Sequence, residues 1–175
     1  DLVKVLTGIR RSGKSVMLDL IKEELCASGI DSRQFISINF ENMSNTHLCT
    51  ATALHDEIIR LASEIGDKVY LFFDEIQEVK AWEKCINSFR VELDCDIYIT
   101  GSNAKLLSGE LATYLAGRYV EFVIYPFSFS EFMELYHTIY PETDSRQCFS
   151  KYLTAGGMPY LINLRYEETA SRQYL

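Results

Sequence analysis

The chain opens with a short apolar run followed by Gly8-Ile9-Arg10-Arg11-Ser12-Gly13-Lys14-Ser15. This is the pattern G-x-x-x-x-G-K-S between a predicted strand at residues 2–7 and a predicted helix at 14–28, which is the context of a phosphate-binding P-loop. Gly8 and Gly13 permit the tight turn that points successive backbone N–H groups into one concavity. The alternative is a glycine turn between a strand and a helix that happens to carry a lysine.

The residues of this loop have distinct predicted roles. Lys14 is expected to reach the β- and γ-phosphates of a nucleotide, and the Ser15 hydroxyl is expected to hold Mg²⁺. The positive end of the helix dipole adds to the attraction for phosphate. Arg10 and Arg11 could touch phosphate or a neighbouring molecule, or they could face solvent. The predicted nucleotide-binding residues are Gly8, Arg10, Arg11, Ser12, Gly13, Lys14, Ser15 and Val16.

A second segment, at residues 69–75, supports the phosphate-binding interpretation. A continuous apolar run ends there in Asp74-Glu75. A strand that is apolar on both faces belongs in the middle of a parallel sheet, and ligands bind at the carboxyl ends of such strands. Asp74 is then the Walker B aspartate, which holds Mg²⁺ through water or beside Ser15. Glu75 is the natural general base for the attacking water. The alternative is a solvated strand end.

Composition excludes several classes of protein. The 175-residue chain has a net charge of −8, which argues against a broad binder of nucleic-acid backbone. Its five scattered cysteines contain no C-x-x-C, so they suggest neither a disulfide framework nor a zinc site and favour a reduced, cytoplasmic compartment. No run is long enough to span a bilayer, and no signal peptide opens the chain. Because the chain begins directly on a strand without Met, we expect a piece of a longer protein.

Strand and helix patterns alternate along the first part of the chain. This alternation predicts an α/β fold, a three-layer P-loop core at residues 1–126 with a parallel sheet. The expected strands lie at 2–7, 34–40, 68–74, 97–100 and 119–125, and the expected helices at 14–28, 54–65, 82–93 and 107–117.

Beyond Pro126 the pattern is helical only. Ser128 and Glu131 have the spacing of a capping box, a further helix is expected at 146–155, and Pro159 suits the first turn of a last helix. We therefore expect residues 127–175 to be the beginning of a helical lid or linker.

The position of Glu75 directly after Asp74 favours the P-loop class in which one strand is added between the P-loop strand and the Walker B strand. The expected strand order is 5-1-4-3-2, with residues 97–100 inserted beside the first strand. That order places Ser102 or Asn103 where a polar side chain can sense the γ-phosphate and orient the water. The alternative is that both residues cap the next helix.

Several segments of the chain resemble the AAA+-type P-loop ATPases of bacteria and archaea. The double arginine inside the P-loop and the run from Tyr125 to Phe132 are the most distinctive of them. The resemblance implies binding of ATP rather than GTP, with Mg²⁺, and a C-terminal domain in the longer protein. The matching segments are 8–15, 72–77, 99–102, 117–118, 125–132 and 156–159.

The resemblance also implies roles for single residues. Ser102, and less well Asn103, matches the first sensor. Arg118 matches an arginine finger, which requires a homo-oligomer if it acts in trans; the alternative is an arginine that satisfies helix-end carbonyls. Asn39 could hold Glu75 in an inactive rotamer, or it could be a polar residue on a half-exposed strand face. The predicted catalytic residues are Glu75, Lys14, Ser102 and Arg118, and the predicted metal ligands are Ser15 and Asp74.

Three functions remain open at this point. The first is a Mg²⁺-dependent ATPase that drives movement of the C-terminal domain or of a partner. The second is an ATP-loaded switch that hydrolyses slowly and controls assembly, because binding and hydrolysis use the same residues. The third, a small-molecule phosphotransferase, is disfavoured because the adjacent carboxylates suit activation of water. Dependence on nucleic acid is a separate open question, and no membrane partner is expected.

Overall fold

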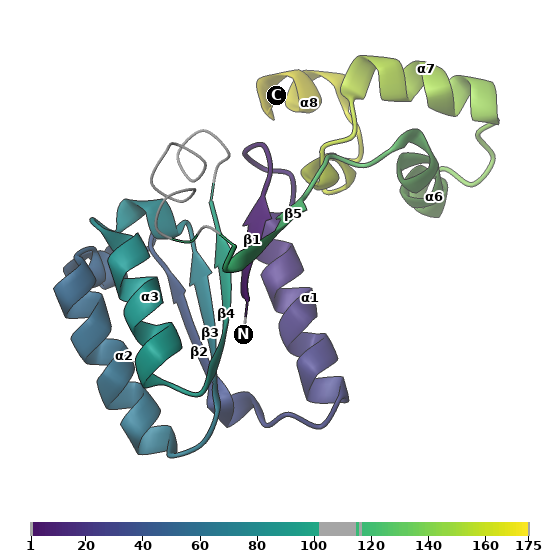
Figure 1. Cartoon of the computed structure of the whole chain (residues 1–175). Coiled ribbons are helices and arrows are strands. Elements are labelled where there is room, and N and C mark those ends of the chain that lie inside the picture. Colours follow the sequence, from purple (N-terminus) through teal and green to yellow (C-terminus); the bar gives the residue numbers. More distant parts are fainter. Residues whose placement is uncertain (1, 102–114, 116, 175) are drawn as a thin grey trace. The chain divides into compact units, whose positions relative to one another are not determined.

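The computed structural model describes residues 2–101, 115 and 117–174 of the chain. They belong to two compact units. The first combines Asp1–Gly8 with Lys14–Val123, and the second combines Ile9–Gly13 with Ile124–Leu175. The first unit contains the sheet and the second contains the C-terminal helices (Figure 1). The division at residue 126 and the action of the C-terminal helices as a lid stay predictions.

Five parallel strands form the sheet, in the order β2-β3-β4-β1-β5. This is the predicted order 5-1-4-3-2 counted from the other edge, so the predicted fold is confirmed. The strands are β1 (Val3–Thr7), β2 (Phe35–Asn39), β3 (Val69–Asp74), β4 (Cys95–Thr100) and β5 (Tyr119–Val123). The predicted strands at 97–100 and 119–125 are thus shifted, since β4 begins two residues earlier and β5 ends two residues earlier.

Helices cover both faces of the sheet. Figure 1 shows α1 (Lys14–Ala27) on one face and α2 (Ala51–Ile65) with α3 (Trp82–Glu92) on the other. Short 3₁₀ helices lie at Ser32–Gln34 (η1), Met43–Leu48 (η2) and Ile76–Glu78 (η3). The predicted helix at 107–117 lies almost entirely outside the described residues. No helix in the described ranges has both the length and the apolar character needed to cross a membrane.

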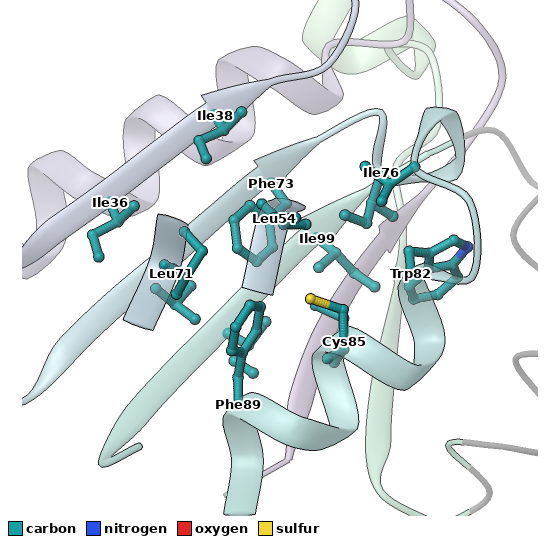
Figure 2. Packing of buried hydrophobic residues seen from close by; sticks show 14 of the residues in the cluster. Ile36, Ile38, Leu54, Leu71, Phe73, Ile76, Trp82, Cys85, Phe89 and Ile99 are labelled. Atoms are coloured by element: carbon teal, nitrogen blue, oxygen red, sulfur yellow. The ribbon is translucent and has the colours of Figure 1, made fainter. Parts of the chain in front are cut away.

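The main core lies between the sheet and the α2–α3 layer. Side chains at alternate positions of the central strand β3, Leu71 and Phe73, point toward Leu54 of α2 and Phe89 of α3 (Figure 2). All four side chains are fully buried. Burial of each contributes about 1.5–3 kcal/mol relative to exposure. Every residue of β3 is buried, as expected for a central strand between two helical layers.

The other face of β3 carries an aromatic ladder. The Phe72 ring stacks on the Tyr98 ring of β4 at a centroid distance of 4.9 Å and meets the Phe35 ring of β2 edge-on at 5.5 Å. Neighbouring strands therefore bring aromatic side chains from three sequence segments into contact. Such pairs each add about 0.5–1.5 kcal/mol beyond burial.

A half-buried ion-pair cluster ties β1 and β4 together. Asp96 of β4 binds the ammonium groups of Lys4 and Lys68, and its Oδ2 lies 2.9 Å from Lys68 Nζ. Burial alone would raise the pKa of the Asp96 carboxyl, but the bonds from Lys4 and Lys68 outweigh it and lower that pKa. These charges pair with one another across the sheet, so the cluster has a structural role.

The second unit has its own small core. Its helices are α6 (Phe129–Ile139), α7 (Ser145–Ala155) and α8 (Glu168–Tyr174). Phe132 and Tyr166 are buried at its centre and meet edge-on at 5.0 Å. The predicted capping box is confirmed, because the Ser128 hydroxyl and the Glu131 carboxylate each accept the other residue's backbone N–H.

The prediction that Pro159 opens the last helix is wrong. Pro159 begins only a 3₁₀ turn, Pro159–Ile162 (η4), and the last helix begins at Glu168. The chain reverses between them, where Arg165 and Tyr166 adopt positive φ values of 49° and 53°. Nothing in their residue types signals this reversal, since both are rare in the left-handed region.

Two of the segments that carry the family resemblance pack on each other in this unit. The Phe127 N–H donates to the Gly157 carbonyl at 2.7 Å, and the Tyr152 hydroxyl donates to the Phe127 carbonyl at 3.1 Å. A Cβ built on Gly157 would lie 2.1 Å from the Phe127 oxygen. Glycine is therefore required at residue 157 for close backbone approach.

Candidate functional site

The phosphate loop runs from the end of β1 to the start of α1. Gly8 and Gly13 have φ values of 151° and 101°, and Arg11 has 69°. The Ser12 N–H donates to the Ile9 carbonyl at 3.3 Å, which closes a turn inside the loop. The two glycines of the predicted motif thus occupy the positions where a side chain would be strained.

The Lys14 side chain is nearly buried and turns back over this loop. Lys14 is 5% exposed, and its Nζ donates to the Gly8 carbonyl at 3.3 Å. Ser15 and Val16, which follow on α1, are exposed. Ser12 is 3% exposed, and its Oγ has no hydrogen-bond partner within the described residues. A buried hydroxyl of this kind inside the loop suits a phosphate oxygen as its missing partner.

The two loop arginines differ in their surroundings. The Arg11 guanidinium donates to the Tyr174 carbonyl and lies over the Tyr174 ring at 4.5 Å, a contact within the second unit. Arg10 is exposed. The structure thus directs Arg11 to a protein partner, and phosphate binding by either arginine stays a prediction.

Asp74, at the end of β3, is held at both carboxylate oxygens. The Thr100 hydroxyl donates to its Oδ1, and the Asn39 amide donates to its Oδ2 at 3.0 Å. Asp74 is 7% exposed and Thr100 is fully buried. Each oxygen keeps further lone-pair capacity for a metal-bound water. The ends of three adjacent strands therefore fix this carboxylate in one orientation.

Glu75 leaves the strand in an unusual conformation. Its φ is 56°, in the left-handed region that non-glycine residues rarely adopt. Its N–H donates to the Thr100 hydroxyl oxygen at 3.0 Å, and its carboxylate accepts a hydrogen bond from the Gln77 side-chain amide. Asn39 thus bonds to Asp74, and the residue that bonds to the Glu75 carboxylate is Gln77.

Gly8, which begins the loop and belongs to the same unit as the acidic pair, stands at the same end of the strands as that pair. In the β1–β4 register Leu6 is opposite Thr100, and in the β3–β4 register Phe73 is opposite Ile99. All three strands are parallel, so Asp74, the last residue of β3, and Gly8, the first residue after β1, both lie at carboxyl ends. Because β4 alone separates β1 from β3, the two strands are about 10 Å apart. This spacing suits one nucleotide triphosphate that contacts both.

Arg118 lies at the opposite ends of the strands, beside the amino end of β1. Its carbonyl accepts the Val3 N–H at 3.0 Å, at the amino end of β1. The five residues of β1 span about 16 Å between this end and the loop. The structure therefore does not bring Arg118 to the site of its own chain. Its role as an arginine finger at the site of a neighbouring copy stays a prediction. The predicted sensors Ser102 and Asn103 lie outside the described residues.

Thr100 and Gln77 belong to the site but were not predicted from the sequence. Thr100 was visible only as the polar residue that ends an apolar strand, and its position beside Asp74 depends on the strand order. Gln77 follows Glu75 by two residues, and it reaches back because the chain turns into η3 at once.

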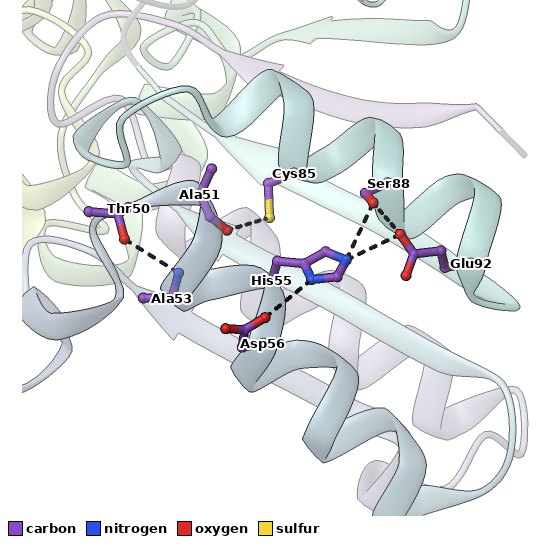
Figure 3. A network of polar contacts seen from close by, with 8 residues as sticks. All are labelled: Thr50, Ala51, Ala53, His55, Asp56, Cys85, Ser88 and Glu92. Carbon is purple, nitrogen blue, oxygen red and sulfur yellow. Dashed lines mark hydrogen bonds and ion pairs between the residues drawn. The ribbon is translucent and has the colours of Figure 1, made fainter.

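A second polar cluster joins α2 to α3 (Figure 3). The His55 Nε2 lies 3.3 Å from the Ser88 Oγ and 3.2 Å from a Glu92 oxygen, and its Nδ1 lies 3.6 Å from Asp56. Although a serine, a histidine and an aspartate lie together, the Ser88 hydroxyl donates to Glu92 rather than to His55. The cluster therefore pairs two helices. Among the described residues, no group of three or more His, Cys, Asp or Glu could hold a metal ion.

The protein has the arrangement of a P-loop nucleotide-binding protein of the AAA type. Its phosphate loop follows the carboxyl end of one parallel strand, its acidic pair lies at the carboxyl end of another, and a single strand separates the two. Residues 1–133 match the family model described as an AAA domain, so the chain belongs to this family. The predicted resemblance to AAA-type P-loop ATPases is thereby confirmed.

Curated relatives come from bacteria and archaea. The chain is 42% identical over 165 residues to an uncharacterized protein of Haemophilus influenzae, which covers 93% of this chain and 40% of that protein. It is 32% identical over 182 residues to an uncharacterized protein of Methanocaldococcus jannaschii, which covers 99% of this chain and 39% of that protein. The chain thus spans about two fifths of these relatives' length.

The fold also matches a solved structure of a distant protein. The structure of C. elegans PCH-2 superposes with a TM-score of 0.63 and 15% sequence identity, over 98% of this chain and 61% of that one. At this identity the match shows the fold alone.

Replacing Thr100 by valine should damage both stability and turnover. Valine has the same shape but no hydroxyl, so Asp74 Oδ1 and the Glu75 N–H lose a buried partner. Leaving buried polar groups unsatisfied costs about 1–3 kcal/mol. Urea denaturation should show this loss, and phosphate release should fall about tenfold or more. The Thr100→Ser variant keeps the hydroxyl and should keep most of the turnover; equal turnover in both variants would contradict a role for the hydroxyl.

Proposed function

We propose that this chain is an ATPase core, which binds ATP with Mg²⁺ and hydrolyses it to ADP and phosphate. The observation that carries the proposal is the acidic pair, fixed by Thr100 and Asn39, at the same end of the strands as the start of the phosphate loop. The choice of ATP over GTP, and the coupling of hydrolysis to a C-terminal domain or partner, rest on the family and are part of the proposal.

The donor set fits a magnesium ion bound mainly through phosphate and water. Ser15 and Asp74 are the residues that would hold it, and Mg²⁺ in such sites uses few protein ligands. When bound, the ion would neutralise charge on the phosphate oxygens. The buried Ser12 hydroxyl, which has no hydrogen-bond partner among the described residues, gives independent support for a phosphate at the loop.

Different residues of the chain would then bind the phosphates, accept the proton and orient the acidic pair. The loop N–H groups and Lys14 would bind and orient the phosphates, and the Lys14 amine would exchange its bond to the Gly8 carbonyl for phosphate oxygens. Glu75 would accept the proton of the attacking water. Thr100 would orient both acidic residues without touching substrate.

A slow ATP-loaded switch is the second candidate function, and Gln77 is the observation that favours it. The Gln77 amide occupies a carboxylate oxygen of Glu75, the proposed base. The other oxygen keeps its lone pairs, but the amide fixes the orientation of the carboxylate, so a base that is fixed away from the attacking water must reorient before it accepts a proton. The switch uses the same binding residues and differs in the rate of the chemical step.

One experiment tests the proposal and separates its two forms. Phosphate release from ATP is measured with Mg²⁺ and with a chelator, beside exchange of a labelled nucleotide. We expect release to need Mg²⁺ and to fall about 100-fold or more in Lys14→Ala, which loses phosphate stabilisation. The Lys84→Ala control, on exposed α3 surface, should match wild type. Hydrolysis far slower than exchange would identify the switch, and wild-type release equal to that of Lys14→Ala would contradict the assigned site.

A further inference from the structure

The edge strand β2 lacks the features that normally protect a sheet edge. It has β3 as its one neighbour among the described strands. Exposed edges are usually blunted by a lysine, a proline, a charged side chain or a bulge. The β2 residues, Phe35-Ile36-Ser37-Ile38-Asn39, include no charge and no proline. By contrast, β5 at the other edge carries Glu121 at its centre. The outer side of β2 is thus open to backbone pairing.

A groove of about 690 Å³ runs along this strand. Its apolar lining combines Ile36 and Ile38 of β2 with Leu61 and Ile65 of α2. The first pair has strand spacing and the second has helix spacing, so each pair presents its side chains to one face. An extended segment beside β2 would place every second side chain on this lining. The groove therefore selects a strand with apolar residues at alternate positions.

The charged residues around the groove are mainly acidic. Asp31, Glu64 and Asp67 contribute three carboxylates, and Arg33 contributes one guanidinium. Arg33 pairs with Asp31, and Arg60 outside the groove binds Glu64. A second copy would bring the same carboxylates to a chain whose net charge is already −8. Three carboxylates against two guanidinium groups leave this surface with a net charge of −1, so a basic partner is favoured over a second copy of this acidic chain.

We propose that the β2 groove binds an extended peptide segment of a partner protein, with apolar residues at alternate positions and lysine or arginine at its ends. The segment adds a sixth strand to the sheet through backbone hydrogen bonds with β2. Its side chains provide specificity through the apolar lining, and its basic ends face the carboxylates. This inference does not depend on nucleotide hydrolysis.

The first test measures fluorescence anisotropy of a labelled seven-residue peptide that has lysine at each end and three valines separated by two threonines. We expect saturable binding to the 175-residue chain. Joint replacement Glu64→Lys and Asp67→Lys should weaken it at least tenfold. The control Glu23→Lys with Glu24→Lys makes the same charge change on exposed α1 residues and should alter affinity less than twofold.

The second test asks whether the bound peptide is a strand. N-methylation of alternate residues removes backbone donors while it keeps the side chains and charges, so it should weaken binding at least tenfold. Bound peptide should also slow amide exchange at residues 35–39. Absence of binding, equal weakening by the two charge reversals, or unchanged affinity of the N-methylated peptide would overturn the proposal. So would sedimentation that shows a dimer which the peptide does not dissociate.

Discussion

Replacement of Glu75 by glutamine is expected to lower phosphate release about 10²–10³-fold and to leave ATP affinity within a few-fold. Glutamine has the size of glutamate but cannot accept a proton from water, and general-base catalysis contributes about this factor. The backbone bond from residue 75 to Thr100 does not involve the side chain and should persist. Single-turnover phosphate release and equilibrium binding of a fluorescent ATP analogue measure the two effects separately.

The matched control is Glu23→Gln, which makes the same chemical change on the exposed surface of α1. It should hydrolyse ATP at the wild-type rate. Unchanged turnover in Glu75→Gln would show that water is activated by another group. A parallel loss of affinity and turnover would assign Glu75 to binding instead of to the chemical step.

The sheet could be predicted because two sequence signals, an apolar run and the carboxylate pair that ends it, point to the same fold. The β3 segment is apolar from Val69 to Phe73, which indicates a strand inside the sheet, and the paired carboxylates Asp74 and Glu75 at its end select the strand order. The carboxyl ends of the helices expected at 14–28, 54–65 and 82–93 were predicted to within one residue. Gly66, which ends α2 in the left-handed conformation, was an informative stop signal. Strand ends lack such a signal, because hydrogen bonds to neighbouring strands decide where β4 and β5 begin and end.

The site was predictable only in the parts that are contiguous in sequence. The loop residues and Asp74-Glu75 have fixed spacing and a stated chemistry. The residues that orient the pair depend on register instead: Asn39 reaches Asp74 because these two are opposite each other in the β2–β3 ladder. A single sequence does not give that register. Thr100 was missed for the same reason, since strand order places it beside Asp74, whereas the role of Gln77 depends on the immediate turn of the chain into η3.

In the second unit, the Gly157→Ala variant is expected to lose about 2–4 kcal/mol of stability. The added methyl would lie 2.1 Å from the Phe127 oxygen, so the backbone must separate, and such overpacking is costly. The separation also weakens the 2.7 Å bond from the Phe127 N–H to the Gly157 carbonyl. Because the chain has two units, amide exchange of α6 and α7 measures this loss better than one global transition.

Gly156→Ala distinguishes crowding from backbone conformation in this prediction. Gly156 has a φ of 74°, but nothing lies within 4 Å of a Cβ built on it. Its ψ of −175° places it in a backbone region that only glycine adopts readily, so alanine there should cost about 1–3 kcal/mol of backbone strain without crowding. If crowding against Phe127 makes glycine necessary, Gly157→Ala must accelerate exchange in α6 and α7 more than Gly156→Ala does. The reverse order would mean that the segment can shift to accept a methyl, and that the 156–159 motif is determined by its turn geometry alone.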